Sequence, residues 1–269
     1  MFAALTAIAA ESGDEHPFPG IRELVVWPEA LFEGTAFGFN KVALISLIAM
    51  AVPVVLFLIA GSRAKQSAVP RGVQNLAEVT VEFVERMIIR QAIGNDPKGM
   101  AFLPLLISMF LFILVGNLFG IIPTAHFGAN ARMANPVILA LLAWVTFIGV
   151  GLKNHGLGYL KEALFPPGVP KALYILVTPI ELISTFLVRP FSLAVRLFAN
   201  MLAGHILLVT FAWLTTSLVT GGILAIISPL PFAMLVAFTG FELLVAFLQA
   251  YIFTLLTAVY IGGALHPAH

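Results

Sequence analysis

Long hydrophobic runs dominate the chain from about residue 42 onward, and polar positions are concentrated between them. A helix that crosses the lipid hydrocarbon needs about 20 mostly apolar residues. We therefore expect five spans, at about residues 42–61, 100–122, 136–152, 173–218 and 223–261. The pattern predicts an all-α integral membrane protein, in which residues 1–41 form an extracytoplasmic segment and residues 42–269 form a single membrane domain.

Three segments depart from a simple perpendicular span. The last two apolar runs, 173–218 and 223–261, are longer than a perpendicular helix needs, and such helices accommodate by tilting. Residues 73–94 instead alternate charged residues such as Glu82 and Arg86 with apolar ones such as Val84. That pattern is typical of an amphipathic helix lying at the membrane interface. The sequence thus predicts two strongly tilted helices and one interfacial helix.

Basic residues gather on one side of the predicted spans. The loop after the first span carries Arg63, Lys65, Arg71, Arg86, Arg90 and Lys98, and the loop after the third carries Lys153, Lys161 and Lys171. Cytoplasmic loops carry an excess of Lys and Arg. We therefore expect the N-terminus outside and, with five spans, the C-terminus in the cytoplasm.

The composition agrees with a membrane protein and excludes several function classes. Hydrophobic residues make up 60% of the chain and charged residues 10%, whereas soluble domains average about 25% charged. A net charge of +1 gives no basis for nucleic-acid binding, and the lack of cysteine excludes thiolate metal sites. No phosphate-binding loop and no zinc-protease His-Glu-x-x-His motif occurs. Residues 1–10 lack the positive region of a signal peptide, so we do not expect cleavage there.

Four charged residues follow Lys171 inside apolar surroundings, namely Glu181, Arg189, Arg196 and Glu242. A charge at the bilayer centre costs about 2.5–3.5 kcal/mol on insertion scales, and such residues usually mark ion paths. Arg196 has no acidic residue within a helical turn and cannot deprotonate. A group outside its helix must therefore supply negative charge. Snorkelling to the interface is the alternative, and it suits Arg189 better because that residue lies nearer the cytoplasmic end.

Helical spacing arranges the polar residues of the last two spans. Arg196 and Asn200 are four apart and share a face, whereas His205 lies roughly half a turn round from Arg196. Glu242 and Gln249 are seven apart and form one stripe. If the two helices run antiparallel, Glu242 comes to the depth of His205, and Gln249 lies nearer the depth of Arg196.

These residue types suit an outer proton path. Histidine and a desolvated or paired carboxylate both change protonation near physiological pH, so His205 and Glu242 are candidates for proton transfer. Arg196 cannot relay protons, but it favours the ionised form of a nearby carboxylate and blocks leakage past itself. Two structural alternatives stay open: His205 as a satisfied buried histidine, and Gln249 as an interhelical hydrogen-bonding residue.

Two segments of the chain resemble a known family. Residues 189–205, RPFSLAVRLFANMLAGH, closely resemble the signature of subunit a of the F-type ATP synthase, and residues 248–256, LQAYIFTLL, resemble its second signature. The five spans, the amphipathic segment and the FPPGVP loop at residues 165–170 fit as well. The resemblance covers nearly the whole chain.

The resemblance implies that Arg196 faces a ring of c subunits, each with a membrane-embedded carboxylate. Two offset half-channels would admit a proton from outside to the ring and release it to the cytoplasm after rotation. Asn200 and Gln249 match family positions at this interface. One bacterial branch has an acidic residue where His205 stands and a histidine where Glu242 stands, so the two types are exchanged here. The implied partners are the c ring, the b subunit of the peripheral stalk and the remaining synthase subunits.

Further candidates line the two paths under this interpretation. Asn117 and His126 are candidates for the outer inlet, Glu181 is a candidate for the exit path near the cytoplasm, and Tyr260 is a candidate for channel lining. Pairing of Glu181 with Arg189, eight residues on, is the structural alternative. The coupling ion, H⁺ or Na⁺, depends on the ring, whose site is not in this chain.

The predicted function is a non-catalytic, proton-translocating subunit without a cofactor, in the plasma membrane of a bacterium. Nucleotide chemistry would then belong to partner subunits. A stand-alone proton-coupled transporter is the main alternative, and it predicts activity in the purified chain. A non-transporting assembly subunit of a respiratory complex is another, but it leaves an unpaired arginine in the membrane unexplained.

Overall fold

The computed structural model describes residues 41–64, 71–122, 128–156, 158–159, 164–165, 173–220 and 222–266. The regular elements in these ranges are all helical. In chain order they are α3 (Lys41–Ala64), α4 (Val73–Phe83), η1 (Val84–Ile89), α5 (Arg90–Ala92), α6 (Pro97–Met100), α7 (Leu103–Ile121), η2 (Ala129–Ala131), α8 (Ala134–His155), α10 (Tyr174–Ile183), η4 (Ser184–Val188), α11 (Arg189–Thr220), η5 (Gly222–Ile227) and α12 (Pro229–Leu265). Residues 1–40 of the predicted extracytoplasmic segment lie outside the described residues.

Five stretches of the described chain are helical, long and apolar enough to cross a membrane. They are Val42–Arg63, Leu103–Ile121, Ala134–His155, Tyr174–Val219 and Ala225–Leu265. The all-α membrane fold and the five spans predicted from hydropathy are thus confirmed. The amphipathic segment is helical from Val73 to Ala92, as α4, η1 and α5.

The helix ends differ from the hydropathy boundaries where polar residues are accommodated locally. The third span begins at Ala134, and in its first turn the side chain of Asn135 donates hydrogen bonds to Ser46 Oγ and to the carbonyl of Ala129, both at 2.7 Å. It ends at His155, because Gly156 follows with a φ of +59°, which is outside the helical region. The fifth run is broken before Pro229, which starts α12 because a proline at N1 gives up no helical hydrogen bond.

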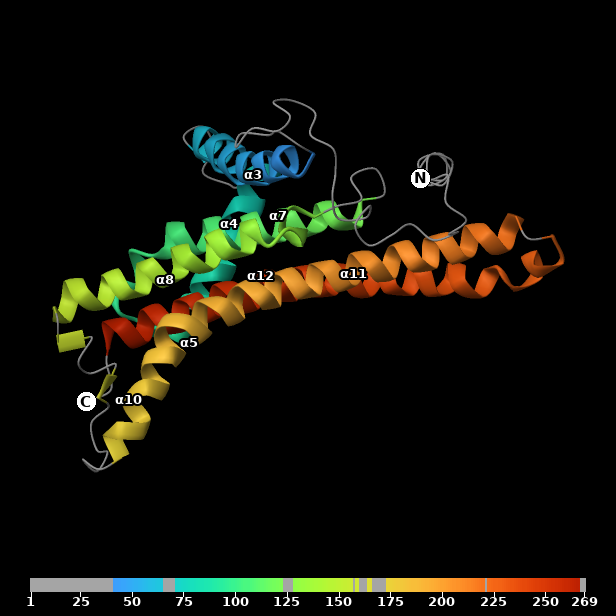
Figure 1. Cartoon of the computed structure of the whole chain (residues 1–269). Helices are drawn as coiled ribbons and strands as arrows, with labels where there is room; N and C mark the ends of the chain where they lie inside the picture. Colours follow the sequence, from blue (N-terminus) through green and yellow to red (C-terminus); the bar gives the residue numbers. More distant parts are fainter. Residues whose placement is uncertain are drawn as a thin grey trace, which may run out of the picture.

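The two longest helices form an antiparallel hairpin (Figure 1). Both α11 and α12 pack against α8, and α12 also packs along α7. Helix α3 contacts α4 and α7, so it lies on the outer side of the bundle. The hairpin extends beyond α7 and α8 at one end, and α10 turns away from α11 at the other (Figure 1). At 37 residues, α12 is about 55 Å long, well above the roughly 30 Å of a bilayer core.

Hydroxyl groups inside the apolar helices bond to their own backbone. Thr210, Thr239, Thr254 and Thr257 each donate to the carbonyl four residues earlier, at 2.7–2.9 Å. Such bonds satisfy polar side chains where no water is available. Threonine is therefore tolerated in the spans without a tertiary partner.

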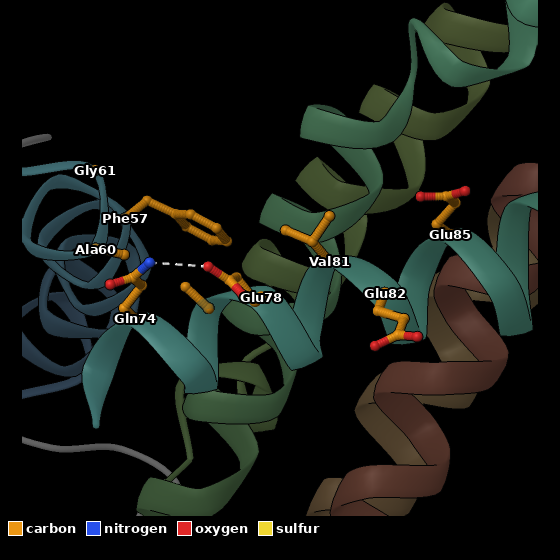
Figure 2. A pocket seen from close by; sticks show the side chains of 9 residues that line it. Phe57, Ala60, Gly61, Gln74, Glu78, Val81, Glu82 and Glu85 are labelled. Atoms are coloured by element: carbon orange, nitrogen blue, oxygen red, sulfur yellow. Dashed lines mark hydrogen bonds between the residues drawn. The ribbon is translucent and has the colours of Figure 1, made fainter. Parts of the chain in front are cut away.

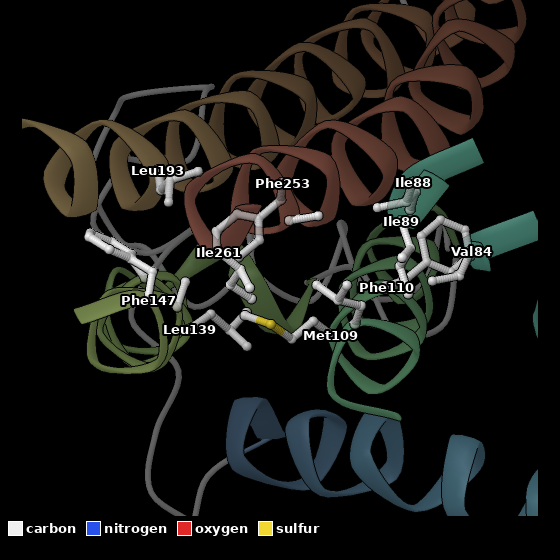
Figure 3. Close-up of a cluster of buried hydrophobic side chains, with 14 of the residues drawn as sticks. Val84, Ile88, Ile89, Met109, Phe110, Leu139, Phe147, Leu193, Phe253 and Ile261 are labelled. Atoms are coloured by element: carbon white, nitrogen blue, oxygen red, sulfur yellow. The ribbon is translucent and has the colours of Figure 1, made fainter. Parts of the chain in front are cut away.

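The main hydrophobic cluster joins η1, α7, α8, α11 and α12 (Figure 3). Its labelled members are Val84, Ile88, Ile89, Met109, Phe110, Leu139, Phe147, Leu193, Phe253 and Ile261. Phe253 is 1% exposed and Phe147 is equally buried, so α12 is held firmly against α8. Gly262 lets α12 approach the backbone of α5, since a Cβ there would lie 2.7 Å from the carbonyl oxygen of Ala92.

The C-terminal ends of α8 and α12 meet the loop before α6. His155 Nε2 lies 3.3 Å from the carbonyl oxygen of Leu265, and His266 Nε2 lies 2.9 Å from Asp96 Oδ2. Lys98 and Lys153 belong to the same end of the molecule. Basic side chains from two predicted cytoplasmic loops are thus gathered together with the end of α12.

Candidate functional site

Asn200 and Gln249 join the two helices of the hairpin. Asn200 Nδ2 on α11 donates a 2.7 Å hydrogen bond to Gln249 Oε1 on α12. Gln249 is buried, and its Nε2 has no hydrogen-bond partner within the described part of the chain. The seven-residue stripe of α12 therefore meets the Arg196–Asn200 face of α11, as helical spacing predicts.

Glu242 lies beside Gly204, one residue before His205. Its carboxyl group is buried, and among the described residues neither oxygen has a hydrogen-bond partner. A Cβ on Gly204 would lie only 2.5 Å from Glu242 Oε1, so the glycine leaves room for this carboxyl group. A buried carboxyl group without a partner is costly, and such groups gather at functional sites.

A cavity of about 380 Å³ lies between α11 and α12. Arg196, Asn200, Glu242 and Gln249 line it together with apolar side chains. The apolar lining residues include Leu207, Phe238, Phe241, Leu248 and Ile252. Phe241 is 62% exposed and Leu248 is 44% exposed, so the cavity adjoins an apolar outer face of the hairpin. One polar site thus unites four of the five principal candidates.

A second, much smaller void lies on the inner side of the same residues. It measures about 10 Å³, close to the space of a single water molecule, and it is lined by Asn117 together with Asn200, Glu242 and Gln249. Asn117 on α7 accepts a 2.8 Å hydrogen bond from Asn130 Nδ2 in η2. The polar site therefore continues from the hairpin into α7.

Arg196 has no anionic partner in the described part of the chain. The ion pairs there are Arg86–Glu82, Arg90–Glu85 and His266–Asp96. Arg196 is half-buried and lines the cavity next to Asn200. A permanent cation in apolar surroundings requires compensation from an anion or from water. The guanidinium group of Arg196 therefore needs a negatively charged partner, and within the described residues neither α11 nor α12 forms an ion pair with it.

The remaining candidates occupy different places. His205 is buried on α11 but does not line the cavity, so its side chain faces another direction than Arg196. Tyr260 lies beneath the guanidinium group of Arg189, which is 5.3 Å from its ring centroid. Glu181 on α10 is half-buried and forms no ion pair with Arg189, so that structural alternative is wrong. His126 lies outside the described residues.

Sequence reasoning missed Asn130 and Asn135. Asn130 is fully buried, and its Oδ1 has no partner among the described residues, while Asn135 bonds to α3 and to η2. The sequence could have indicated them, because burying a carboxamide without a hydrogen bond costs free energy as it does for other polar groups, and both carboxamides lie next to an apolar run. Both residues lie before the third predicted span, at 136–152, and so outside the apolar runs.

A separate pocket of about 460 Å³ lies between α3 and the α4–η1 helix (Figure 2). Gln74 Nε2 donates a 3.0 Å hydrogen bond to Glu78 Oε1, and Glu82 pairs with Arg86 at 2.8 Å. These carboxylates already have partners, unlike Glu242. Within the described ranges no three His, Cys, Asp or Glu side chains converge to hold a metal ion.

Comparison with known proteins agrees with the site. The family model described as ATP synthase A chain matches residues 43–262. The chain is similar to ATP synthase subunit a of Rhodococcus erythropolis, 43% identical over 266 residues that cover 98% of this chain and 94% of the relative. It is also similar to ATP synthase subunit a of Mesorhizobium japonicum, 48% identical over 215 residues, covering 80% of this chain and 82% of the relative. The chain therefore belongs to the ATP synthase A chain family.

Proposed function

We propose that this chain is the stationary, proton-translocating subunit of a rotary F-type ATP synthase, in which Arg196 faces the carboxylates of a c-subunit ring. Two offset half-channels lead protons to and from that ring, and their flow drives rotation. The chain itself performs no nucleotide chemistry, which belongs to other subunits of the complex. The family membership supports the proton-translocating role, and the site geometry supports its details.

The main support is Arg196 in the cavity between α11 and α12, which forms no ion pair with the described residues. Its neighbours in that cavity include the carboxamides of Asn200 and Gln249, which hydrogen-bond without bringing charge. The outer face beside the cavity is apolar, with Phe241 and Leu244 each at least 60% exposed. A partner with an apolar surface and a membrane-embedded carboxylate matches both features, because it covers the face and supplies the missing anion.

Glu242 and His205 belong to the outer half-channel in this proposal. The void beside Asn117 has about the volume of one water molecule, and a water there bridges α7 and Glu242 in this proposal. The carboxamides on one side and the carboxyl group on the other provide its hydrogen-bonding partners. His205 follows Gly204 directly, so it lies at the same depth as Glu242 on the hairpin. The outer path then contains one imidazole, on α11, and one carboxylate, on α12, and exchanging the two between the helices leaves this pair intact.

Glu181 and Tyr260 are assigned to the cytoplasmic half-channel. Glu181 is half-buried on α10 and is not neutralised by Arg189, so it is available to accept a proton leaving the ring. Arg196 separates the two half-channels, because a permanent cation raises the free energy of a proton next to it. A proton therefore passes by way of the ring carboxylate and not directly along the hairpin.

The peripheral stalk b subunit and the remaining synthase subunits complete the proposed complex. We assign the chain to a bacterial plasma membrane with the N-terminus outside and the C-terminus in the cytoplasm. The meeting of Lys98 and Lys153 with the end of α12 supports this orientation, since basic side chains favour the cytoplasmic side.

The test is proton-driven ATP synthesis in inverted membrane vesicles that carry Arg196→Ala, with blotting to establish that the complex assembles. Synthesis is expected to be abolished, whereas Arg63→Ala, a control at the exposed end of α3, is expected to retain the wild-type rate. Wild-type synthesis in Arg196→Ala would refute the proposal. Proton flux through the purified chain alone, without a ring, would instead favour a stand-alone transporter.

A further inference from the structure

The long fourth span is interrupted by a short π-helical segment, η4, between α10 and α11. The N–H of Arg189 bonds to the carbonyl of Ser184, five residues earlier, instead of to Thr185. Pro190 explains the interruption, because its ring has no N–H and clashes with the carbonyl four residues before it in a regular helix. The widened turn accommodates the proline, and the chain bends near this point (Figure 1).

This arrangement leaves the carbonyl of Thr185 without a backbone donor. The N–H of Arg189 is directed to Ser184, and Pro190 has no N–H to offer. Thr185 is 2% exposed, so water does not replace the missing donor easily. A buried carbonyl that loses its partner is destabilising, and the bend is therefore tolerated only if another group donates to it.

Trp144 on α8 supplies that donor. Its indole Nε1–H lies 3.3 Å from the carbonyl oxygen of Thr185, 41 positions away in the chain. The indole ring also contacts the ring of Phe186 edge-on, with centroids 5.9 Å apart. One side chain thus provides both the hydrogen bond and an apolar contact to two successive residues of η4.

The opposite side of the bend is held by α12. Arg189, the first residue of α11, lies over the ring of Tyr260, and Tyr260 in turn contacts Phe147 on α8, with ring centroids 5.6 Å apart. Helix α8 therefore contacts the bend directly through Trp144 and indirectly through Phe147. The direction in which α11 leaves the bend is fixed from both sides.

We propose that Trp144 is a positioning residue for Arg196, acting through its hydrogen bond to Thr185; this inference rests on the proposed function. Arg196 lies 11 residues beyond Thr185, about 16 Å along the helix, so a 10° change at the bend moves it by about 3 Å. A displacement of that size removes Arg196 from hydrogen-bonding reach of a ring carboxylate. The bend therefore sets the alignment of Arg196 with its partner.

The first experiment measures the bend in the assembled complex by spin-label distances. The chain has no cysteine, so single cysteines at the exposed positions Ile175 on α10 and Leu214 on α11 accept labels selectively. Trp144→Phe keeps the ring and removes the N–H, and we expect the distance distribution to shift or broaden. Thr146→Val is the matched control, since the Thr146 hydroxyl bonds only within α8 to Leu142, and it is expected to leave the distances unchanged.

The same variants are assayed for ATP synthesis per unit of proton-motive force. Trp144→Phe is expected to lower synthesis between about tenfold and 100-fold, because misplacing a reacting group by about 1 Å lowers a rate by up to about 100-fold. Thr146→Val is expected to retain the wild-type rate. Equal distance distributions in the two variants would overturn the inference. If Arg196→Ala still synthesises ATP while Trp144→Phe shifts the distances, the proposed function fails and the role of Trp144 in the bend stands.

Pro190→Ala provides an independent check. Pro190→Ala restores a backbone N–H and removes the ring clash, so the turn can return to the regular register, in which the N–H of Arg189 donates to Thr185. Trp144→Phe is therefore expected to change the distances less in the Pro190→Ala background than in the wild type. Equal effects in both backgrounds would show that the indole N–H does not serve the Thr185 carbonyl.

Discussion

Gly204 is the position where the smallest change reaches the candidate site. Replacing it with alanine places a methyl group 2.5 Å from Glu242 Oε1 and 3.0 Å from Cδ. To restore an ordinary contact of 3.4 Å, the carboxyl oxygen must retreat by about 0.9 Å. Because the oxygen is at the end of a flexible side chain, it moves more readily than the packed helices do.

The expected effects on stability and on transport differ. A strained Glu242 rotamer costs about 0.5–1.5 kcal/mol. Alanine in place of glycine inside a helix recovers about 0.8–1.0 kcal/mol, so assembly of the complex should be nearly unchanged. Misplacement of a reacting group by about 1 Å lowers a rate by up to about 100-fold. We therefore expect Gly204→Ala to lower proton-driven synthesis between about tenfold and 100-fold in a fully assembled complex.

Gly240→Ala is the matched control for the same assay. It lies two residues before Glu242 on α12, and a Cβ there meets nothing within 4 Å. Combining Gly204→Ala with Glu242→Asp should recover part of the rate, because the shorter side chain withdraws from the methyl group. A Gly204→Ala complex that matches the Gly240→Ala rate would refute the importance of the Glu242 carboxyl position.

Two further predictions concern the hairpin and the end of α8. Asn200→Leu removes the donor to the buried Gln249, and we expect it to lower the unfolding free energy in an SDS titration by about 1–3 kcal/mol. The double variant with Gln249→Leu should recover part of this loss. If the losses of the two single variants simply add in the double variant, the hydrogen bond is contradicted. Burial raises the pKa of Tyr159 above its ordinary 10.0, and Arg189 opposes this more weakly. The unfolded chain then ionises first, so stability falls as pH rises from 10.0 through the folded pKa. Tyr159→Phe should lose less stability than the wild type in thermal unfolding over that range, and identical losses would exclude this contribution.

The fold was largely predictable because lipid imposes a simple rule on the sequence. Every apolar run of sufficient length became a helix, and the seven-residue spacing of Glu242 and Gln249 gave the facing stripe of α12. The contact between Asn200 and Gln249 follows from helical periodicity and an antiparallel pair. These features depend on local pattern and need little knowledge of distant residues.

Features that depend on distant partners were not predictable. Hydropathy does not register the π-helical turn before Pro190, since its residues are as apolar as their neighbours. The donor that stabilises it, Trp144, belongs to another helix. In the same way, the bond from Asn130 to Asn117 depends on how the helices pack. The spacing of residues in the sequence determines on which face of its helix a side chain lies. The packing of the helices determines which residues of other helices contact that face.

The main hydrophobic cluster has a mechanical consequence for the hairpin. It holds α11 through Leu193 and Leu197 and α12 through Phe253 and Ile261, all at one end of the pair. Farther along, the helices rely on contacts with each other, such as Phe211 against Phe238 at 5.1 Å. Arg196 lies inside the anchored part, beside Leu197. A sideways force on its guanidinium group is therefore carried to α8 by this cluster and by the contact of Trp144 with the bend together, whereas the residues after Leu197 on α11 and before Ala250 on α12 are not members of the cluster.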